Sequence, residues 1–130
     1  MVVTPLYAGL LAIWFLVLSA RVVQGRVRPG SPSLGDGGNP EMLRRIRGHA
    51  NLAEYVPLIL LLIGFLETSG APKWELHLLG GTLLVARLLH GYALSFTESF
   101  AFGRTAGAVL TFVTLLVAGA LCIRLGAGAF

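Results

Sequence analysis

Residues 47–66 read R-G-H-A-N-L-A-E-Y-V-P-L-I-L-L-L-I-G-F-L, so a polar cluster opens an apolar segment long enough to enter a membrane. Arg47, Asn51 and Glu54 are spaced i, i+4 and i+7, which places them within about 60° of one another on one helical face. Tyr55 extends the edge of that face. An ionisable side chain at membrane depth costs roughly 2.5 to 3.5 kcal/mol. We therefore expect this polar stripe (Arg47, Asn51 and Glu54) to face a partner or a wet cavity.

The composition predicts an integral membrane protein. Of the 130 residues, 55% are hydrophobic and only 12% are charged, whereas a soluble domain carries about 25% charged residues. The mean hydropathy is +0.79. The net charge of +4 does not indicate a nucleic-acid partner, because most basic residues flank apolar segments, as membrane topology requires. We expect one domain, residues 1–130.

Four segments supply the roughly 20 apolar residues that a membrane-spanning helix needs. They predict helices over about 4–24, 41–68, 72–94 and 103–125, joined after the first helix by a Gly- and Pro-rich loop at 25–40. Asn39 is a suitable N-cap for the second helix, with Pro40 at its first position. The first apolar segment lacks the features of a cleaved signal peptide. Short connections between the later helices predict an all-α, up-down four-helix bundle.

The distribution of basic residues predicts the orientation in the membrane. The side that holds the first and third loops is rich in arginine, whereas Lys73 and Arg124 lie on the other side. The first and third loops should therefore be cytoplasmic and both termini outside. The polar stripe then opens toward the cytoplasm. The arginines on that side are Arg21, Arg26, Arg28, Arg44, Arg45, Arg47, Arg87 and Arg104.

Arg87 and His90 form a second polar group on one face of the third predicted helix. One interpretation is structural: Arg87 pairs with Glu54, and His90 bonds a carbonyl. The other is a bound anion, because Arg21, Arg47 and Arg104 supply more positive charge than one glutamate neutralises. The sequence favours the anion.

The remaining chemistry-bearing residues predict no metal site. The three histidines are dispersed, with no H-x-x-x-H pair. His49 lies opposite the stripe and should make an interhelical or loop contact, and His77 should lie at the membrane interface. Cys122 is the only cysteine, and we expect it to pack as a small apolar residue.

The motifs together resemble the MAPEG proteins, the membrane-associated proteins in eicosanoid and glutathione metabolism, and above all their small bacterial members. The resemblance covers nearly the whole chain. It rests on R-x-H-x-N-x-x-E-Y-x-P at residues 47–57, R-x-x-H at 87–90, S-A-R at 19–21 and Arg-Thr at 104–105.

The resemblance implies a homotrimer in the bacterial inner membrane that binds glutathione between subunits, at the cytoplasmic side, and uses it as a transferase or peroxidase against apolar electrophiles or lipid hydroperoxides. Arg104, followed by Thr105, matches the arginine that favours the reactive thiolate. Family enzymes commonly carry a tyrosine where this chain has Leu94, and Tyr92 lies two positions earlier. The residues that the resemblance assigns to glutathione are Arg21, Arg47, Asn51, Glu54, Tyr55, Arg87, His90 and Tyr92.

Two other functions are compatible with four membrane helices. The family also includes members that bind lipid without turnover, so a lipid- or glutathione-binding scaffold is the first alternative. A small multidrug exporter is the second, but such exporters depend on a carboxylate in their first helix, and this chain has none there. No residue identifies the apolar substrate, and another thiol could replace glutathione.

Overall fold

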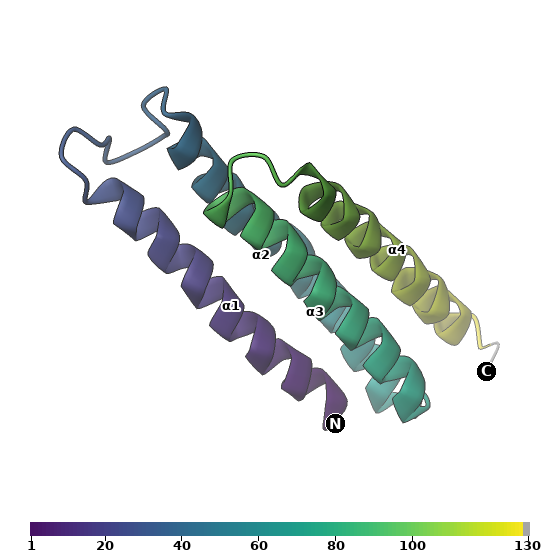
Figure 1. Cartoon of the computed structure of the whole chain (residues 1–130). Helices are drawn as coiled ribbons and strands as arrows, with labels where there is room; N and C mark the ends of the chain where they lie inside the picture. Colours follow the sequence, from purple (N-terminus) through teal and green to yellow (C-terminus); the bar gives the residue numbers. More distant parts are fainter. Residues whose placement is uncertain (129–130) are drawn as a thin grey trace.

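The computed structural model describes residues 1–128. They form four long helices, which are α1 (Val3–Arg26), α2 (Pro40–Thr68), α3 (Lys73–Phe96) and α4 (Ala101–Gly126). Consecutive helices run in opposite directions, as Figure 1 shows. The prediction of an all-α, up-down bundle is therefore confirmed. Residues 129 and 130 of the predicted domain lie outside the described part of the chain.

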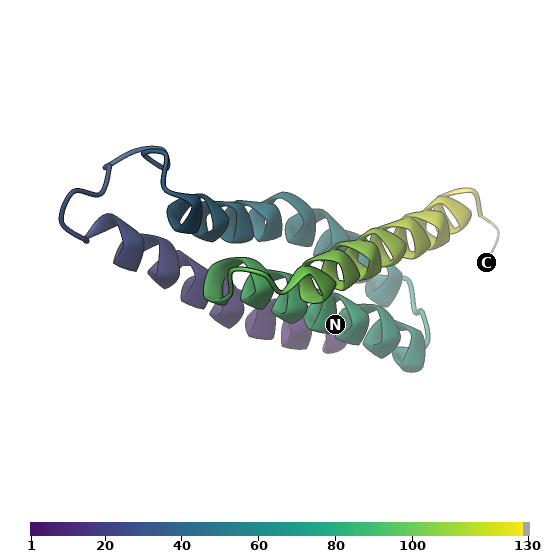
Figure 2. The same ribbon diagram turned by 45° about the horizontal axis from the view of Figure 1, so that its top comes forward.

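The packing order of the helices decides which residues can share a site. α3 contacts each of the other helices, and α2 also contacts both α1 and α4. Within residues 1–128, α1 and α4 do not touch each other. Figures 1 and 2 show them on opposite flanks of the α2–α3 pair. A side chain on α1 and one on α4 therefore belong to different surfaces of the protomer.

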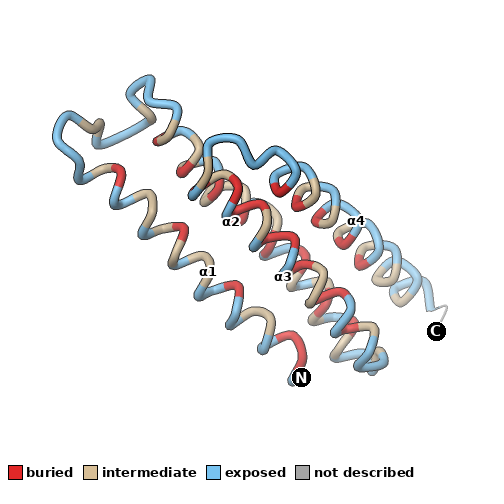
Figure 3. The backbone as a smooth tube through the Cα atoms, in the orientation of Figure 1, coloured by how far each residue is buried: buried red, intermediate tan, exposed pale blue. Residues whose placement is uncertain are grey.

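The interior is a narrow apolar layer between the helices. Its buried members include Leu11 and Leu18 of α1, Ile59 and Ile63 of α2, and Leu83 of α3. Figure 3 shows that the buried positions form stripes along the helices, with exposed positions on their outer sides. The outer sides carry many large apolar side chains, among them Leu16, Phe102, Leu116 and Ile123.

All four helices are long and apolar enough to cross a membrane. α1 has 24 residues, which at about 1.5 Å per residue spans about 36 Å, more than the roughly 30 Å hydrocarbon core of a bilayer. Outward apolar side chains are favourable in lipid, because no water has to be ordered around them. The fold and its surface are therefore those of a membrane-embedded bundle.

Local capping explains where α2 begins and how α1 is attached at its other end. The Asn39 side-chain oxygen accepts hydrogen bonds from the backbone N–H groups of Glu41 (2.9 Å) and Met42 (3.2 Å), as predicted for this N-cap. At the opposite end of the bundle, the Glu67 carboxylate accepts hydrogen bonds from the backbone N–H groups of Val3 and Thr4, both at 2.7 Å. Glu67 of α2 thereby caps the first turn of α1.

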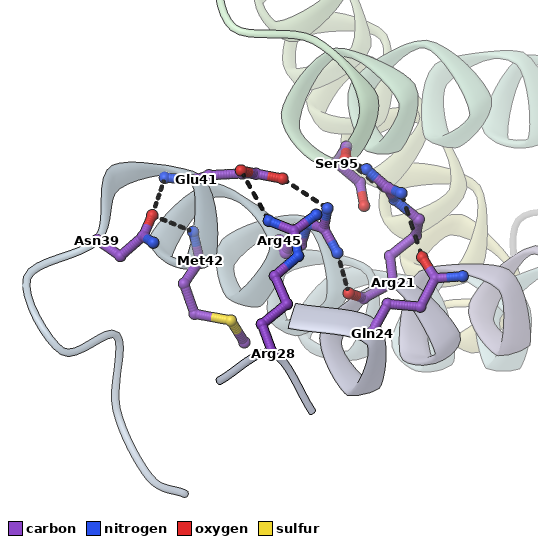
Figure 4. Close-up of polar contacts among 8 residues, drawn as sticks. All are labelled: Arg21, Gln24, Arg28, Asn39, Glu41, Met42, Arg45 and Ser95. Carbon is purple, nitrogen blue, oxygen red and sulfur yellow. Dashed lines mark hydrogen bonds and ion pairs between the residues drawn. The ribbon is translucent and has the colours of Figure 1, made fainter. Parts of the chain in front are cut away.

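A buried arginine joins the end of α1 to the beginning of α2 (Figure 4). The guanidinium of Arg45, with only 2% of its side chain exposed, pairs with Glu41 one turn earlier. It also donates a hydrogen bond to the backbone carbonyl of Arg21 at 2.8 Å. Arg28 approaches the other carboxylate oxygen of Glu41 at 3.2 Å. This network anchors both ends of the first loop.

Candidate functional site

The polar stripe lies on an open face of α2. The Arg47 guanidinium is 3.6 Å from the Glu54 carboxylate, and these side chains are 51% and 53% exposed. Asn51 is half-buried between them in the helical register. The pair is loose and reachable, so both charges remain available to a ligand.

Arg87 and His90 lie behind this face, in the interior between α3 and α4. Arg87 is 1% exposed. Its Nη2 lies 3.2 Å from Nδ1 of His90, and its Nη1 donates to the Thr111 hydroxyl at 3.3 Å. The structural interpretation of an Arg87–Glu54 ion pair is wrong, because Glu54 reaches Arg47 on its own helix instead.

Three helices bring the stripe, His90 and Arg104 to one end of the bundle. Arg47 of α2 and Arg104 of α4 both lie within electrostatic range of His90 in α3. Tyr55 packs its ring against Phe112 of α4, with ring centroids 5.5 Å apart. This arrangement forms a cationic cluster, defined here as the three arginines Arg47, Arg87 and Arg104 together with the imidazole of His90, and Glu54 is its acidic member.

A glycine permits the close approach of α3 and α4 on which the cluster depends. A Cβ atom added at Gly107 would lie 2.6 Å from the Ala86 carbonyl oxygen and 2.6 Å from the His90 Cβ. No larger residue fits without moving backbone. Gly107 therefore brings the first turns of α4 against His90.

Arg104 and Thr105, the predicted catalytic residues, are both exposed at the beginning of α4. Arg104 lines a cavity of about 100 Å³ together with Arg44, Glu98 and Phe100. No hydrogen bond within residues 1–128 joins the Thr105 hydroxyl to the cationic cluster. Arg104 is thus an exposed member of the cluster, while Thr105 lies at its margin.

Arg21 and Tyr92 belong to a separate group on the α1 side of α3. Arg21 donates through Nη2 to the Ser95 carbonyl at 2.8 Å, and its guanidinium lies 4.4 Å from the centroid of the Phe96 ring. Tyr92 stacks on the same ring at 5.6 Å. Since the described residues of α1 and α4 do not contact each other, one protomer does not bring Arg21 to Arg104. This division could not be predicted from the sequence, because it depends on helix packing.

Arg44 was not among the predicted site residues, yet it lies between the two groups. It is half-buried, and it lines both the cavity beside Arg104 and a second cavity of about 180 Å³ that also contains Arg21 and Ser95. Its position one turn before Arg47 was the available signal, because residues at i and i+3 share a helical face. No spacing or motif in the sequence indicated Thr111, the acceptor for Arg87, as a member of the site.

The other histidines make contacts between helices. His49 stacks on Phe15 of α1 with ring centroids 4.6 Å apart, as predicted for a helix contact. Nδ1 of His77 lies 3.0 Å from the Tyr7 hydroxyl. Cys122 donates a weak hydrogen bond to the Leu62 carbonyl at 3.4 Å. Among residues 1–128, no three histidine, cysteine, aspartate or glutamate side chains are close enough together to hold a metal ion.

Comparison with known proteins agrees with this architecture. The chain is 40% identical over 90 residues to the inner membrane protein YecN of Escherichia coli strain K12, a match that covers 69% of this chain and 68% of YecN. YecN of Escherichia coli strain CFT073 matches equally well. No solved structure matches significantly. With its four candidate spans, the chain is a multi-pass inner membrane protein, like YecN. The model of the MAPEG family matches residues 4–124, so the chain belongs to the MAPEG family.

Proposed function

We propose that this protein is a membrane-bound, glutathione-dependent transferase that also uses hydroperoxides as alternative substrates. The observation that carries the proposal is the accessible Arg47–Glu54 pair, 3.6 Å apart and about half exposed. A purely structural ion pair in a membrane protein would be sheltered and tightly bonded. An open pair of opposite charges instead suits a ligand that carries both signs.

Glutathione has that charge pattern, with two carboxylates and one ammonium group. In this proposal Glu54 binds the ammonium, Arg47 binds a carboxylate, and Asn51 and Tyr55 donate hydrogen bonds to the peptide portion. His90, held by Arg87 at 3.2 Å, forms the rear wall of the site. Membership of the MAPEG family supports this choice of ligand.

The separation of Arg21 from Arg104 of the cationic cluster supports a site shared by neighbouring protomers. Arg21 of α1 lies on the Phe96 ring, on which Tyr92 also stacks, and within residues 1–128 α1 does not contact α4, which carries Arg104. In a homotrimer, Arg21 of one protomer would complete the stripe of the next and bind the second carboxylate. The exposed apolar faces of α1 and α4 offer the surfaces for such an assembly.

In this proposal Arg104 activates the thiol of glutathione. A guanidinium close to the glutathione sulfur favours the thiolate, which is the nucleophile, and the Thr105 hydroxyl would donate a hydrogen bond to the sulfur. The sulfur forms a bond to an electrophilic carbon, and the bonding pair departs with the leaving group. With a hydroperoxide, sulfur attacks the terminal oxygen, the O–O bond breaks and the alcohol departs. A second glutathione then converts the sulfenic acid to a disulfide and water.

Binding measurements on purified protein in detergent test the proposal. Arg47→Ala and Glu54→Ala should each weaken saturable glutathione binding by about 10-fold or more, since a hydrogen bond to a charged group contributes about 1.5 to 3 kcal/mol. Arg28→Ala, which removes an exposed arginine of the first loop, is the matched control and should bind normally. Folded Arg47→Ala and Glu54→Ala proteins that bind glutathione like wild type would contradict the proposal.

A further inference from the structure

A groove runs between α3 and α4 from the first turns of α3, at the end of the bundle opposite Arg47 and Arg104, to the level of Val85 and Leu110. Its volume is about 420 Å³, and its lining is mostly apolar. The lining residues are His77, Leu78, Gly81, Thr82 and Val85 of α3 with Leu110 of α4. From His77 to Val85 the helix rises about 12 Å at about 1.5 Å per residue. One leaflet contributes about half of the roughly 30 Å hydrocarbon core, so the groove follows most of one leaflet.

Gly81 creates the hollow in the middle of this groove. A Cβ atom added there would meet the Tyr7 hydroxyl at 3.6 Å, an ordinary contact. A Cβ atom therefore fits at Gly81 without moving the neighbouring helices, in contrast to Gly107. Its effect is to leave space between the exposed side chains of Leu78 and Val85.

The mouth of the groove holds the imidazole of His77, with one basic residue, Lys73, beside it. His77 is exposed, and the Tyr7 hydroxyl lies 3.0 Å from its Nδ1, so Nε2 is on the edge that faces away from Tyr7. Lys73 lies one turn earlier on the same face of α3 and is also exposed. Both belong to the first turns of α3, where the helix dipole favours an anion. Glu75 projects to the other side of the helix, by its position in the helical register.

We propose that this groove binds an anionic glycerophospholipid, with the phosphate at Lys73 and His77 and one acyl chain along Gly81 and Val85. A soluble anion would not account for the apolar lining that continues to membrane depth, whereas a phospholipid matches both parts. Trp74 is exposed beside the mouth, in keeping with a headgroup-level position for this turn. The site is separate from the proposed glutathione site, which lies at the other end of the bundle.

Native mass spectrometry of the delipidated protein, titrated with phosphatidylglycerol or phosphatidylcholine, tests the assignment. We expect one phosphatidylglycerol per protomer to bind more tightly than phosphatidylcholine. Gly81→Leu fills the hollow and should weaken phosphatidylglycerol binding at least 10-fold. Gly119→Leu is the matched control, because a side chain there meets nothing within 4 Å, and it should bind like wild type.

Charge variants test the mouth separately. Lys73→Ala should weaken phosphatidylglycerol binding about fivefold, the contribution expected of one basic residue near a membrane surface. Lys73→Arg should restore it.

Equal affinities for the two lipids, or wild-type binding by a folded Gly81→Leu protein, would overturn the proposal. So would efficient disulfide cross-linking of Leu78→Cys between two chains in a Cys122→Ser background, since a second copy would then cover the groove. Glutathione binding should be unchanged in Gly81→Leu, which separates this test from that of the proposed function.

Discussion

The Arg87 guanidinium in α3 donates a hydrogen bond to the hydroxyl of Thr111 in α4, at 3.3 Å, in the buried interior of the bundle. The same hydroxyl donates to the Gly107 carbonyl at 2.7 Å, which orients its lone pairs toward Arg87. His90 contacts the other arm of the guanidinium. A buried charge is therefore held by neutral polar groups, and α3 and α4 are joined directly behind the proposed glutathione site.

Thr111→Val should destabilise the protein, because it removes an acceptor from a buried charged donor. We expect a loss of about 1 to 3 kcal/mol in the free energy of unfolding. Thr114→Val is the control, since within residues 1–128 the Thr114 hydroxyl bonds only the Leu110 carbonyl of its own helix, and its loss should be smaller. Unfolding of both variants in mixed micelles, followed by circular dichroism, measures the difference. Equal losses would show that the Arg87 contact contributes nothing.

Gly107→Ala should separate the first turns of α4 from α3. The added Cβ would lie 2.6 Å from both the Ala86 carbonyl oxygen and His90, and overpacking of this kind costs about 1 to 3 kcal/mol. Gly119→Ala, in open space on the same helix, should instead be neutral or stabilising by up to about 1 kcal/mol, since alanine favours helix. Melting temperatures in detergent compare the two. A Gly107→Ala protein as stable as wild type would argue against close helix contact at this position.

Arg45→Ala should be far more destabilising than Arg28→Ala, although both arginines bind Glu41. The Arg45 side chain is buried and also binds the Arg21 carbonyl. Removing one partner of a buried ion pair costs about 3 to 5 kcal/mol. That cost is an upper bound for Arg45→Ala, because Glu41 is itself 43% exposed. The exposed Arg28 pair should contribute about 0 to 1 kcal/mol. Limited proteolysis of the loop at 27–39 and thermal unfolding provide the measurement. Similar losses in the two variants would contradict the anchoring role of Arg45.

Arg104→Ala should leave glutathione bound but reduce its reactivity. The ultraviolet absorbance of bound thiolate should fall, and kcat with a model electrophile should drop about 10²-fold, as for the loss of one electrostatic stabiliser. Arg104→Lys retains the charge and should recover much of the rate. If Arg104→Ala changes neither the thiolate absorbance nor the rate, the lipid- or glutathione-binding scaffold becomes the better interpretation.

The sequence predicted correctly those features that depend on interactions between residues close together in the chain. The N-cap at Asn39 follows from the chemistry of residues adjacent in the chain, and the contact made by His49 follows from its position opposite the stripe. The shared face of Arg47 and Glu54 follows from helical periodicity, and the structure brings these two charges to 3.6 Å. Of the two interpretations of Arg87, the ion pair with Glu54 is wrong, because periodicity cannot show which side chain of another helix lies opposite, and the bound anion stays a prediction. Asn51, Tyr55 and Thr105 remain predicted ligand contacts.

By itself, the sequence determined the four apolar helices, their alternating direction and the polar stripe, since hydropathy, short connections and the 3.6-residue period are local properties of the chain. Only the tertiary structure decided that α1 and α4 lie on opposite flanks, that Arg45 is buried and Arg47 open, and that Thr111 receives Arg87. Those outcomes depend on which faces of the helices pack together. The choice of faces depends on steric fit between segments that are distant in the sequence, as at Gly107, where α4 packs closely against α3.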